Sequence, residues 1–342
     1  MRLLTTLYIT DHRARVGVQS SALMVAQGDG ARMRVPLEAL QTVVLACNAQ
    51  ITSEAMAACV RHHVGVTSVR RNGAIRFALR GGISGNVHLR VAQVRAADDP
   101  DRVSQIARWL VAGKLQNLRL MLQRWSWDAD TPTKRALRRI ARMIEDRVAA
   151  LAAAGDTNAI RGYEGDGTRI YFRGLRLHLA ASGSALMFDR RNRRPPRDPI
   201  NALLSFAYGV VLSEVAGALE SVGLDPQIGF LHGIRAGRPS LALDLVEELR
   251  PAVADRFVVG LATRGVLSDA DFLHTTGGAC YLTDDGRAKF FEAYEQFKSA
   301  EVPHRLLGRS LPRASLPVVQ ATLLARYLRG DLPAYPPYVM VS

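Results

Sequence analysis

Gly81-Gly82-Ile83-Ser84-Gly85-Asn86 divides this chain of 342 residues into two stretches with different hydrophobic periodicity. Before it, short apolar and β-branched runs alternate with turn residues, which is typical of strands. After it, apolar residues recur about every 3.6 positions, which is typical of amphipathic helices. The sequence therefore predicts an α+β protein. A small, mostly β N-terminal domain (1–82) is joined by a linker (83–95) to a larger all-α domain (96–342).

Seven short runs predict the strands of the N-terminal domain, and one helix interrupts them. The runs are Leu3–Thr10, Arg15–Val18, Leu23–Ala26, Arg32–Val35, Thr42–Leu45, Val66–Val69 and Ile75–Leu79. Asn72-Gly73, between the last two runs, predicts a tight hairpin turn. Thr52 or Ser53 is placed to cap a helix from Glu54 to about His63.

Capping residues followed by proline mark helix starts in the C-terminal domain. Asp99 with Pro100 predicts one start, and Asp198 with Pro199 predicts another, whose helix Gly223 ends. The apolar stripes within these helices predict core-forming faces. The proline-rich stretch from residue 332 to 338 predicts an extended segment lying against the surface.

The chain is strongly basic, and its basic residues are almost all arginine. It has 45 Lys and Arg against 31 Asp and Glu, a net charge of +14, and only four of the 45 are lysine. Arginine binds phosphate bidentately, whereas lysine acts more as a point charge. We therefore expect a phosphate-rich partner. The alternative is that the basic residues are only solvated. The candidate nucleic-acid contacts are the arginines of one loop: Arg190, Arg191, Arg193, Arg194 and Arg197.

The cysteines and the N-terminus exclude several classes of protein. Cys47, Cys59 and Cys280 are odd in number and form no CxxC pair, so they fit buried apolar positions in a reducing compartment better than disulfides or zinc sites. The first residues do not resemble a signal peptide, and no apolar run approaches the roughly 18–20 residues of a membrane span. We expect a cytoplasmic protein with no membrane partner.

Glu164 stands between glycines in Gly162-Tyr163-Glu164-Gly165-Asp166-Gly167. Glycine lets the backbone approach a ligand closely, and it weakens a helix. Taken alone, these residues favour a helix start whose acidic first turn interacts with the helix dipole. The alternative is a functional carboxylate, because flanking glycines are an unusual choice for structure alone.

A histidine and a cluster of acids follow downstream. His232 ends the apolar stretch Gly229-Phe230-Leu231-His232, where a core histidine is the alternative to a ligand. Asp244, Glu247 and Glu248 are spaced i, i+3 and i+4, so they share the helix face opposite an apolar stripe. Three such close carboxylates repel one another unless a cation or arginines lie among them. The alternative is a solvated acidic face.

Taken together, these residues make a donor set for a hard divalent cation. Carboxylate oxygens with one imidazole nitrogen suit Mn²⁺ or Mg²⁺ better than zinc with sulfur ligands. Such an ion can polarise a phosphoryl oxygen and stabilise an in-line displacement. The sequence contains no GxxxxGK[ST] and no GxSxG, so a P-loop and a serine nucleophile have no support.

Four motifs in this order resemble the CRISPR-associated integrase-endonuclease family, which inserts new spacers into the repeat array. They are Gly162–Gly165, Asn201–Tyr208, Gly229–His232 and Ser240–Arg250. The arginine- and proline-rich loop before Asn201 and the stretch from Leu323 to Leu332 resemble the branch found with subtype I-C systems. The resemblance runs along nearly the whole chain.

The resemblance implies an N-terminal β domain that dimerises and a helical domain that carries the active site. It implies that Glu164, His232 and Glu247 are catalytic ligands of Mn²⁺ or Mg²⁺. It implies that Asp244, one turn before Glu247, is a further catalytic acid that supports them.

The expected roles of two acids near these motifs are less specific. Asp166 stands where the family often has small or uncharged residues, and it is expected either to support the site or to cap the following helix. For Glu248, pairing with an arginine is the alternative to a place at the site.

The implied reaction is strand transfer, in which a 3′-hydroxyl of a captured DNA duplex attacks a phosphodiester at the repeat boundary. With water as the attacker, the same site acts as an endonuclease. The implied partners are the captured spacer duplex, the CRISPR repeat, a second copy of the chain in a homodimer, and a small ferredoxin-like CRISPR-associated protein that bridges two dimers.

Two other functions stay open. One is a non-catalytic, arginine-rich nucleic-acid-binding protein, which would have no need of the set formed by Glu164, His232 and Glu247. The other is a general metal-dependent repair nuclease for branched DNA. It would share the site, so only the resemblance favours integration.

Overall fold

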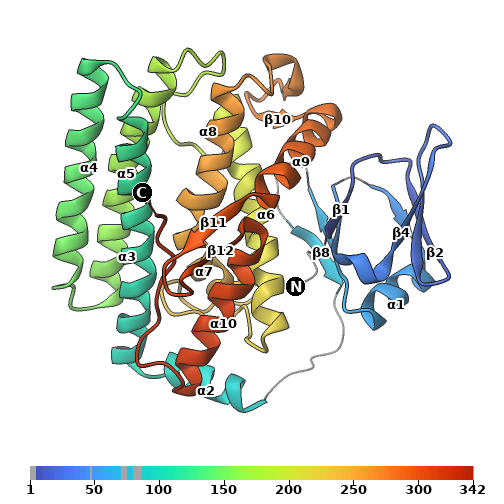
Figure 1. Cartoon of the computed structure of the whole chain (residues 1–342), viewed down its shortest axis with the longest axis horizontal. Helices are drawn as coiled ribbons and strands as arrows, with labels where there is room; N and C mark the ends of the chain where they lie inside the picture. Colours follow the sequence, from blue (N-terminus) through green and yellow to red (C-terminus); the bar gives the residue numbers. More distant parts are fainter. Residues whose placement is uncertain (1–4, 47, 71–74, 80–86, 342) are drawn as a thin grey trace.

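The chain folds into a strand-rich N-terminal region followed by a larger helical region, as the computed structural model shows (Figure 1). The structure describes residues 5–46, 48–70, 75–79 and 87–341. The predicted α+β class is confirmed. The glycine-rich stretch 81–86 lies outside the described residues. Residues 87–95 of the expected linker are not irregular, because they belong to helix α2 (Val87–Ala97).

Two four-stranded sheets form the N-terminal region, in the orders β1-β5-β7-β8 and β4-β3-β2-β6. The strands are β1 (Thr5–Ile9), β2 (Arg15–Gln19), β3 (Ala22–Ala26), β4 (Arg32–Pro36), β5 (Leu40–Leu45), β6 (Gln50–Ile51), β7 (Gly65–Val69) and β8 (Ile75–Leu79). All seven predicted runs are strands. β7 and β8 pair antiparallel, as a hairpin requires, while the predicted turn at Asn72-Gly73 lies outside the described residues. β6 was not predicted, since two residues show no periodicity.

The single helix of this region, α1 (Ser53–Arg61), begins where the sequence places it. Thr52 is the capping residue, and its Oγ1 accepts a hydrogen bond from the Ala55 N–H at 3.2 Å. Cys59 is fully buried against the sheets, and Cys280 is equally buried in the helical region, as expected of small apolar side chains. Cys47 lies outside the described residues.

The helical region is built around three long helices, residues 100–125, 131–151 and 157–181, that lie side by side (Figure 1). Its helices are α3 (Pro100–Trp125), α4 (Thr131–Leu151), α5 (Thr157–Ala181), α6 (Pro199–Ser221), α7 (Ser240–Leu249), α8 (Arg256–Thr263), α9 (Asp284–Ser299) and α10 (Leu316–Arg329). Asp99 and Asp198 cap α3 and α6 as predicted, and the last helical residue of α6 is Ser221, two residues before Gly223.

The expected all-α composition of this region is wrong in detail. Two short hairpins interrupt the helices: β9 (Phe272–His274) pairs with β10 (Cys280–Leu282), and β11 (Glu301–His304) pairs with β12 (Arg309–Pro312). Strands of three or four residues are too short to show alternation in the sequence.

Helix α6 is long and apolar enough to cross a membrane by length and composition alone. Within the structure, 67% of its most apolar window is buried, where it packs against α7 and α10. Its hydrophobicity is therefore that of a core helix surrounded by protein.

The two regions meet where β1 contacts α9. The ring of Tyr8 stacks on Phe291 with centroids 4.2 Å apart. Lys298 Nζ donates to the Tyr8 hydroxyl at 3.0 Å and pairs with Glu214 at 3.0 Å and Glu295 at 2.9 Å. These contacts fix the first strand to the helical region through a buried lysine.

The proline-rich stretch lies only partly on the surface, which corrects the expectation: Pro333 and Ala334 are exposed, but the aromatic residues that follow are buried. Tyr335, Tyr338 and Met340 are each at most 5% exposed. The backbone of this segment is held by Asn117 of α3, which donates to the Tyr338 carbonyl and accepts from the Met340 N–H, both at 2.8 Å. The segment is thus part of the core.

Glu248 of α7 anchors the same segment. Its carboxyl group accepts hydrogen bonds from the Tyr335 hydroxyl at 2.6 Å, from Gln320 Nε2 at 2.9 Å and from the Tyr338 N–H at 3.0 Å. Burial raises the pKa of Glu248 to about 8, although these three donors act to lower it. Glu248 therefore holds a proton in the folded protein at neutral pH.

This protonation predicts a pH dependence of stability. Between its ordinary pKa of 4.5 and about 8, the unfolded chain releases a proton that the folded chain keeps, so the free energy of unfolding falls as the pH rises. Glu248→Gln has no carboxyl group at this position, so its stability does not fall in this way. The unfolding free energy of the variant minus that of wild type should therefore rise across this pH range by up to several kcal/mol, at about 1.4 kcal/mol per pKa unit. Urea denaturation at a series of pH values measures it. Glu292→Gln, an exposed change on α9, is the control, and parallel curves for Glu248→Gln and wild type would refute the prediction.

Candidate active site

Glu164 lies in the middle of α5, so the expectation of a helix start is wrong. The glycines around it differ in role. A Cβ atom on Gly167 would collide with Leu115 Cδ2, whereas Gly162 and Gly165 have no neighbour within 4 Å of such an atom. Gly167 therefore allows α5 to pack closely on α3, which brings Glu164 next to Lys114 of α3.

His232 lies in the loop between α6 and α7, and Asp244 of α7 organises that loop. The fully buried carboxylate of Asp244 accepts hydrogen bonds from the N–H groups of Phe230, Leu231 and His232 at 2.6, 2.9 and 2.8 Å. The Asp244 Oδ1 atom also lies 2.7 Å from His232 Nδ1. When Nδ1 donates this hydrogen bond to Asp244, a neutral ring carries its lone pair on Nε2, where another partner can bind.

The loop leaves no room for a side chain at Gly229. A Cβ atom there would lie 2.7 Å from the Ser240 carbonyl carbon and 2.8 Å from Asp244 Oδ2. The backbone must come this close for three successive N–H groups to reach one carboxylate. Glycine is therefore required at this position by packing.

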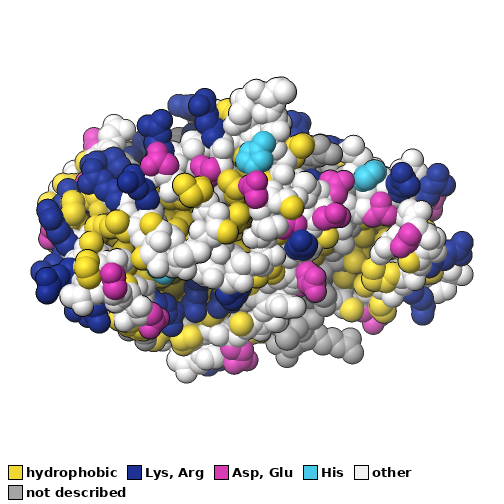
Figure 2. All heavy atoms as spheres, turned by 90° about the horizontal axis from the view of Figure 1, so that it is seen from above, with side chains coloured by type: hydrophobic (Ala, Val, Ile, Leu, Met, Phe, Trp, Pro, Cys, Tyr) yellow, Lys and Arg dark blue, Asp and Glu magenta, His cyan; other side chains and the backbone are white. Residues whose placement is uncertain are grey.

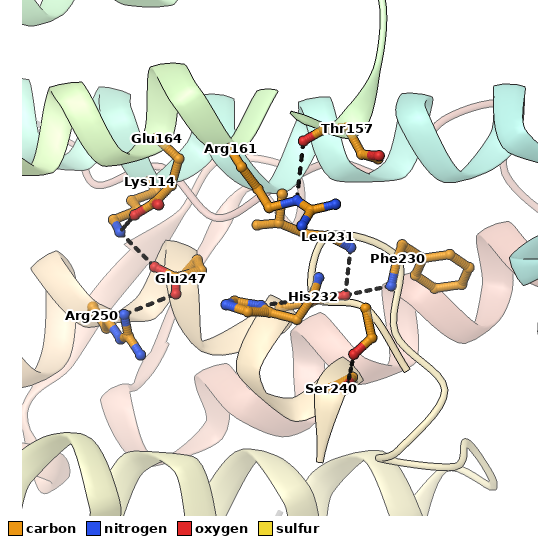
Figure 3. Close-up of polar contacts among 12 residues, drawn as sticks. Lys114, Thr157, Arg161, Glu164, Phe230, Leu231, His232, Ser240, Glu247 and Arg250 are labelled. Carbon is orange, nitrogen blue, oxygen red and sulfur yellow. Dashed lines mark hydrogen bonds and ion pairs between the residues drawn. The ribbon is translucent and has the colours of Figure 1, made fainter. Parts of the chain in front are cut away.

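Glu247 lies one turn after Asp244 and is held by two cations. Arg250 Nη1 lies 2.8 Å from its Oε1, and Lys114 Nζ lies 2.6 Å from its Oε2. Lys114 also contacts Glu164 Oε1, so its ammonium group bridges the two glutamates (Figure 3). Burial acts to raise the pKa of Glu247, but Arg250 and Lys114 outweigh it and hold the pKa at about 2. Glu247 is therefore an anion.

A π-helical turn (Arg250–Asp255) follows α7 and returns two more side chains to the site. The Arg250 guanidinium lies over the ring of Tyr208 at 4.9 Å, and the Tyr208 hydroxyl donates to Asp255 Oδ1 at 2.6 Å. Burial raises the pKa of Asp255 to about 6, although the bond from Tyr208 lowers it. The Tyr208 ring thus contacts Arg250 and is itself held by Asp255.

The three acids of α7 are buried, so a solvated acidic face is excluded. Cations do lie among them, as their mutual repulsion requires. They nevertheless separate into three environments, and Glu248 bonds to the end of the chain rather than to an arginine or to the site. Asp166 neither caps a helix nor joins the site, because it pairs with Arg147 at 2.8 Å and with Arg169.

The arginine loop before α6 divides into one inward residue and four exposed ones. Arg191 donates to Asn201 Oδ1 at 2.7 Å and to Ser205 Oγ at 3.1 Å, and its guanidinium lies 5.4 Å from the Tyr208 ring centroid. Its role in the structure is to fix the loop to α6. The others are exposed and free to meet a ligand: Arg190, Arg193, Arg194 and Arg197.

Sequence reasoning missed the cations and the ring that hold the predicted acids: Lys114, Arg250, Tyr208 and Asp255. Arg250 and Tyr208 lie within recognised motifs, but nothing in the sequence pairs them with each other. Lys114 carries one signal, because it is one of only four lysines in the chain.

The described part of the chain contains no group of three His, Cys, Asp or Glu side chains placed to hold a metal ion as they stand. Glu164 and Glu247 are instead joined by an ammonium group, with the His232 ring directed toward them (Figure 3). Two carboxylates that share one buried cation, with an imidazole nearby, are donors that suit Mn²⁺ or Mg²⁺.

Comparison with known proteins identifies the family. The family model described as CRISPR associated protein Cas1 matches residues 7–296. The CRISPR-associated endonuclease Cas1 1 of Moorella thermoacetica is 38% identical over 338 residues, which cover 98% of each chain.

Solved structures share the fold. A casposase bound to integration product superposes with a TM-score of 0.83 at 21% identity, over 98% of this chain and 94% of that one. A chain of a Cas6-RT-Cas1–Cas2 complex superposes with a TM-score of 0.81 at 21% identity, over 99% of this chain and 36% of that one. Since the family model spans most of the sequence and a relative aligns along nearly all of it, the chain belongs to the Cas1 family of CRISPR-associated endonucleases.

Proposed function

We propose that this chain is a divalent-metal-dependent DNA integrase and endonuclease that inserts new spacer DNA into a CRISPR array. The observation that carries the proposal is the pair formed by the partly exposed Glu164 and the buried Glu247, which share one cation and have His232 directed toward them. A protein that only binds DNA has no reason to place two carboxylates around one buried cation.

Glu164, Glu247 and His232 Nε2 would hold Mn²⁺ or Mg²⁺. The bound ion would polarise a phosphoryl oxygen and stabilise the charge of an in-line displacement. Asp244 fixes the ring of His232 and leaves Nε2 free, while Arg250 fixes Glu247. These two residues position ligands, so Asp244 contributes to catalysis through His232.

The reaction exchanges one phosphodiester for another. The 3′-hydroxyl of the captured duplex forms a new P–O bond at the repeat boundary and gives its proton to solvent. The bond from phosphorus to the 3′-oxygen of the repeat strand breaks, and that oxygen leaves as a hydroxyl. No residue of the chain becomes covalently attached, which agrees with the absence of nucleophile motifs from the sequence. Water in place of the 3′-hydroxyl gives endonuclease cleavage.

The proposal extends to the partners. We infer a homodimer formed through the N-terminal sheets and a small ferredoxin-like CRISPR-associated protein that bridges two dimers, since a structural neighbour was solved together with Cas2. The arginine-rich loop and the stretch 323–332 favour a place in the subtype I-C branch, and the family favours a cytoplasmic location.

The basic surface supports DNA as the substrate. Lys and Arg side chains gather at the end of the molecule formed by α3, α4 and α5 and again over the N-terminal strands (Figure 2). With a net charge of +14, the chain attracts a polyanion at long range. We assign the close phosphate contacts to the loop arginines: Arg190, Arg193, Arg194 and Arg197.

The decisive experiment is strand transfer of a labelled duplex with a free 3′-hydroxyl into a supercoiled plasmid that carries the repeat, with the ferredoxin-like partner and Mn²⁺ or Mg²⁺. Wild type should join the DNA only with metal. His232→Ala should lose joining by two orders of magnitude or more, on the scale expected when an essential catalytic interaction is removed. His274→Ala, which changes a half-exposed histidine on β9, is the control. DNA binding without joining or cleavage by wild type would establish the binding protein instead.

The loop geometry predicts that Gly229→Ala impairs the site. The added methyl group forces the loop away from Asp244, so His232 loses its fixed orientation. Changes to groups that orient a metal ligand lower metal affinity or activity about 10–100-fold. Isothermal titration with Mn²⁺ and the joining assay measure the effect. Gly233→Ala in the same loop has no atom within 4 Å of its new Cβ and should behave as wild type, and equal effects of the two changes would contradict the argument.

The loop arginines predict a change in the salt dependence of DNA binding. Replacing Arg190, Arg193, Arg194 and Arg197 together with alanine should weaken binding. The slope of log affinity against log salt should become shallower by about 0.9 for each phosphate that the variant no longer neutralises. Alanine at Arg135, Arg138, Arg139 and Arg142, four exposed arginines of α4, removes the same charge and serves as the control. If both variants lower the slope equally, the loop has no special role and only net charge matters.

A further inference from the structure

Lys114 is a buried cation at the centre of the proposed ligand set. Its side chain is 3% exposed, and its ammonium group contacts Glu164 Oε1 and lies 2.6 Å from Glu247 Oε2. Thr168 donates to the same Glu164 oxygen at 3.0 Å. In the close-up view, the ammonium lies between the two glutamates that a divalent ion would have to share (Figure 3).

The composition of the chain shows that a lysine is specifically needed here. Only four of 45 basic residues are lysine, yet two of those four, Lys114 and Lys298, are buried and each joins two carboxylates. An ammonium group is compact and donates in three directions, whereas a guanidinium is planar and pairs best with one carboxylate at a time. A chain that uses arginine almost everywhere thus has lysine where one cation must fit between two acids.

The charges at the site balance without a divalent ion. Lys114 and Arg250 supply two positive charges, and Glu164 and Glu247 supply two negative charges. A divalent ion on the same oxygens would lie in contact with the ammonium group in a buried place, where like charges repel strongly. Lys114 and the ion therefore compete for the two carboxylates.

The lysine has a further carboxylate within the same pocket. A small cavity, of about 10 Å³, is lined by Lys114, Thr168, Tyr208, Arg250 and Asp255, among others. Asp255 is buried and accepts a hydrogen bond from the Tyr208 hydroxyl. An ammonium group that leaves Glu164 and Glu247 can turn toward Asp255 without becoming an unpaired buried charge.

We propose that Lys114 is a positioning residue that holds Glu164 and Glu247 together before the divalent ion binds, and that the ion displaces it toward Asp255. The inference rests on the metal dependence of the proposed function. It adds that the site is assembled without metal, and that metal affinity is limited by the need to displace an internal cation.

The test measures metal binding and thermal stability rather than activity. Full-length wild type, Lys114→Met and Lys134→Met are titrated with Mn²⁺ by calorimetry, and their melting temperatures are recorded with EDTA and with saturating Mn²⁺. Lys134, in the first turn of α4, is partly exposed and is the matched control. Lys114→Gln, which keeps hydrogen-bond donors but no charge, is the second variant in case the methionine form does not fold without metal.

Lys114→Met should melt at a lower temperature than wild type in EDTA, because the buried Glu247 and the partly exposed Glu164 lose their shared cation. It should bind Mn²⁺ about tenfold more tightly, or about 1.4 kcal/mol, and the ion should raise its melting temperature more than it raises that of wild type. Lys114→Gln should change in the same direction, and Lys134→Met should match wild type.

Two results overturn the inference, and they are distinguishable. If wild type binds Mn²⁺ and neither Lys114 variant binds it more tightly, Lys114 does not compete with the ion, and the proposed function stands without the inference. If wild type binds neither Mn²⁺ nor Mg²⁺, the metal dependence of the proposed function fails, and the inference fails with it.

Discussion

Three carboxylates buried on one short helix are the constraint on which the rest of the structure depends. A carboxyl group removed from water is tolerated only when hydrogen-bonding groups or cations surround it, whether it is ionised, as Glu247 is, or protonated, as Glu248 is. Asp244, Glu247 and Glu248 point into three different parts of the molecule. The loop before α7 supplies backbone N–H groups, α3 and the π-helical turn supply cations, and the end of the chain supplies a hydroxyl and an N–H. Helix α7 is therefore the element around which loop, bundle and terminal segment are arranged.

The features that the sequence predicts well are those encoded by neighbouring residues. Thr52, Asp99 and Asp198 cap helices through N–H groups two or three positions away, and the N-terminal strands carry their own alternation. The features that it predicts badly depend on distant parts of the chain. Glycines beside Glu164 suggest a break in the helix, but α5 continues through them because Gly167 lets it pack on Leu115.

The candidate site shows the same division. The residue types and spacing of Glu164, His232 and Glu247 indicate a divalent-ion site, and the structure brings Glu164 and Glu247 together through one cation. That cation, Lys114, lies 133 residues before Glu247 in the sequence, so no local sequence pattern predicts the contact. Glu248 has the same spacing pattern as its neighbours and a different environment, since its partners come from α10 and the terminal segment. Helical periodicity gives the face on which an acid lies, but only the fold decides what that face meets.

The burial of the terminal segment has a consequence for how the protein is made. Residues 335–340 cover the inner side of α7 and α3, the two helices that carry Glu247 and Lys114. During synthesis on the ribosome, residues 335–340 emerge after α7, so α7 is translated before these core partners exist. The nascent chain therefore cannot complete the hydrogen bonds that support α7 and α3 until translation has passed Met340.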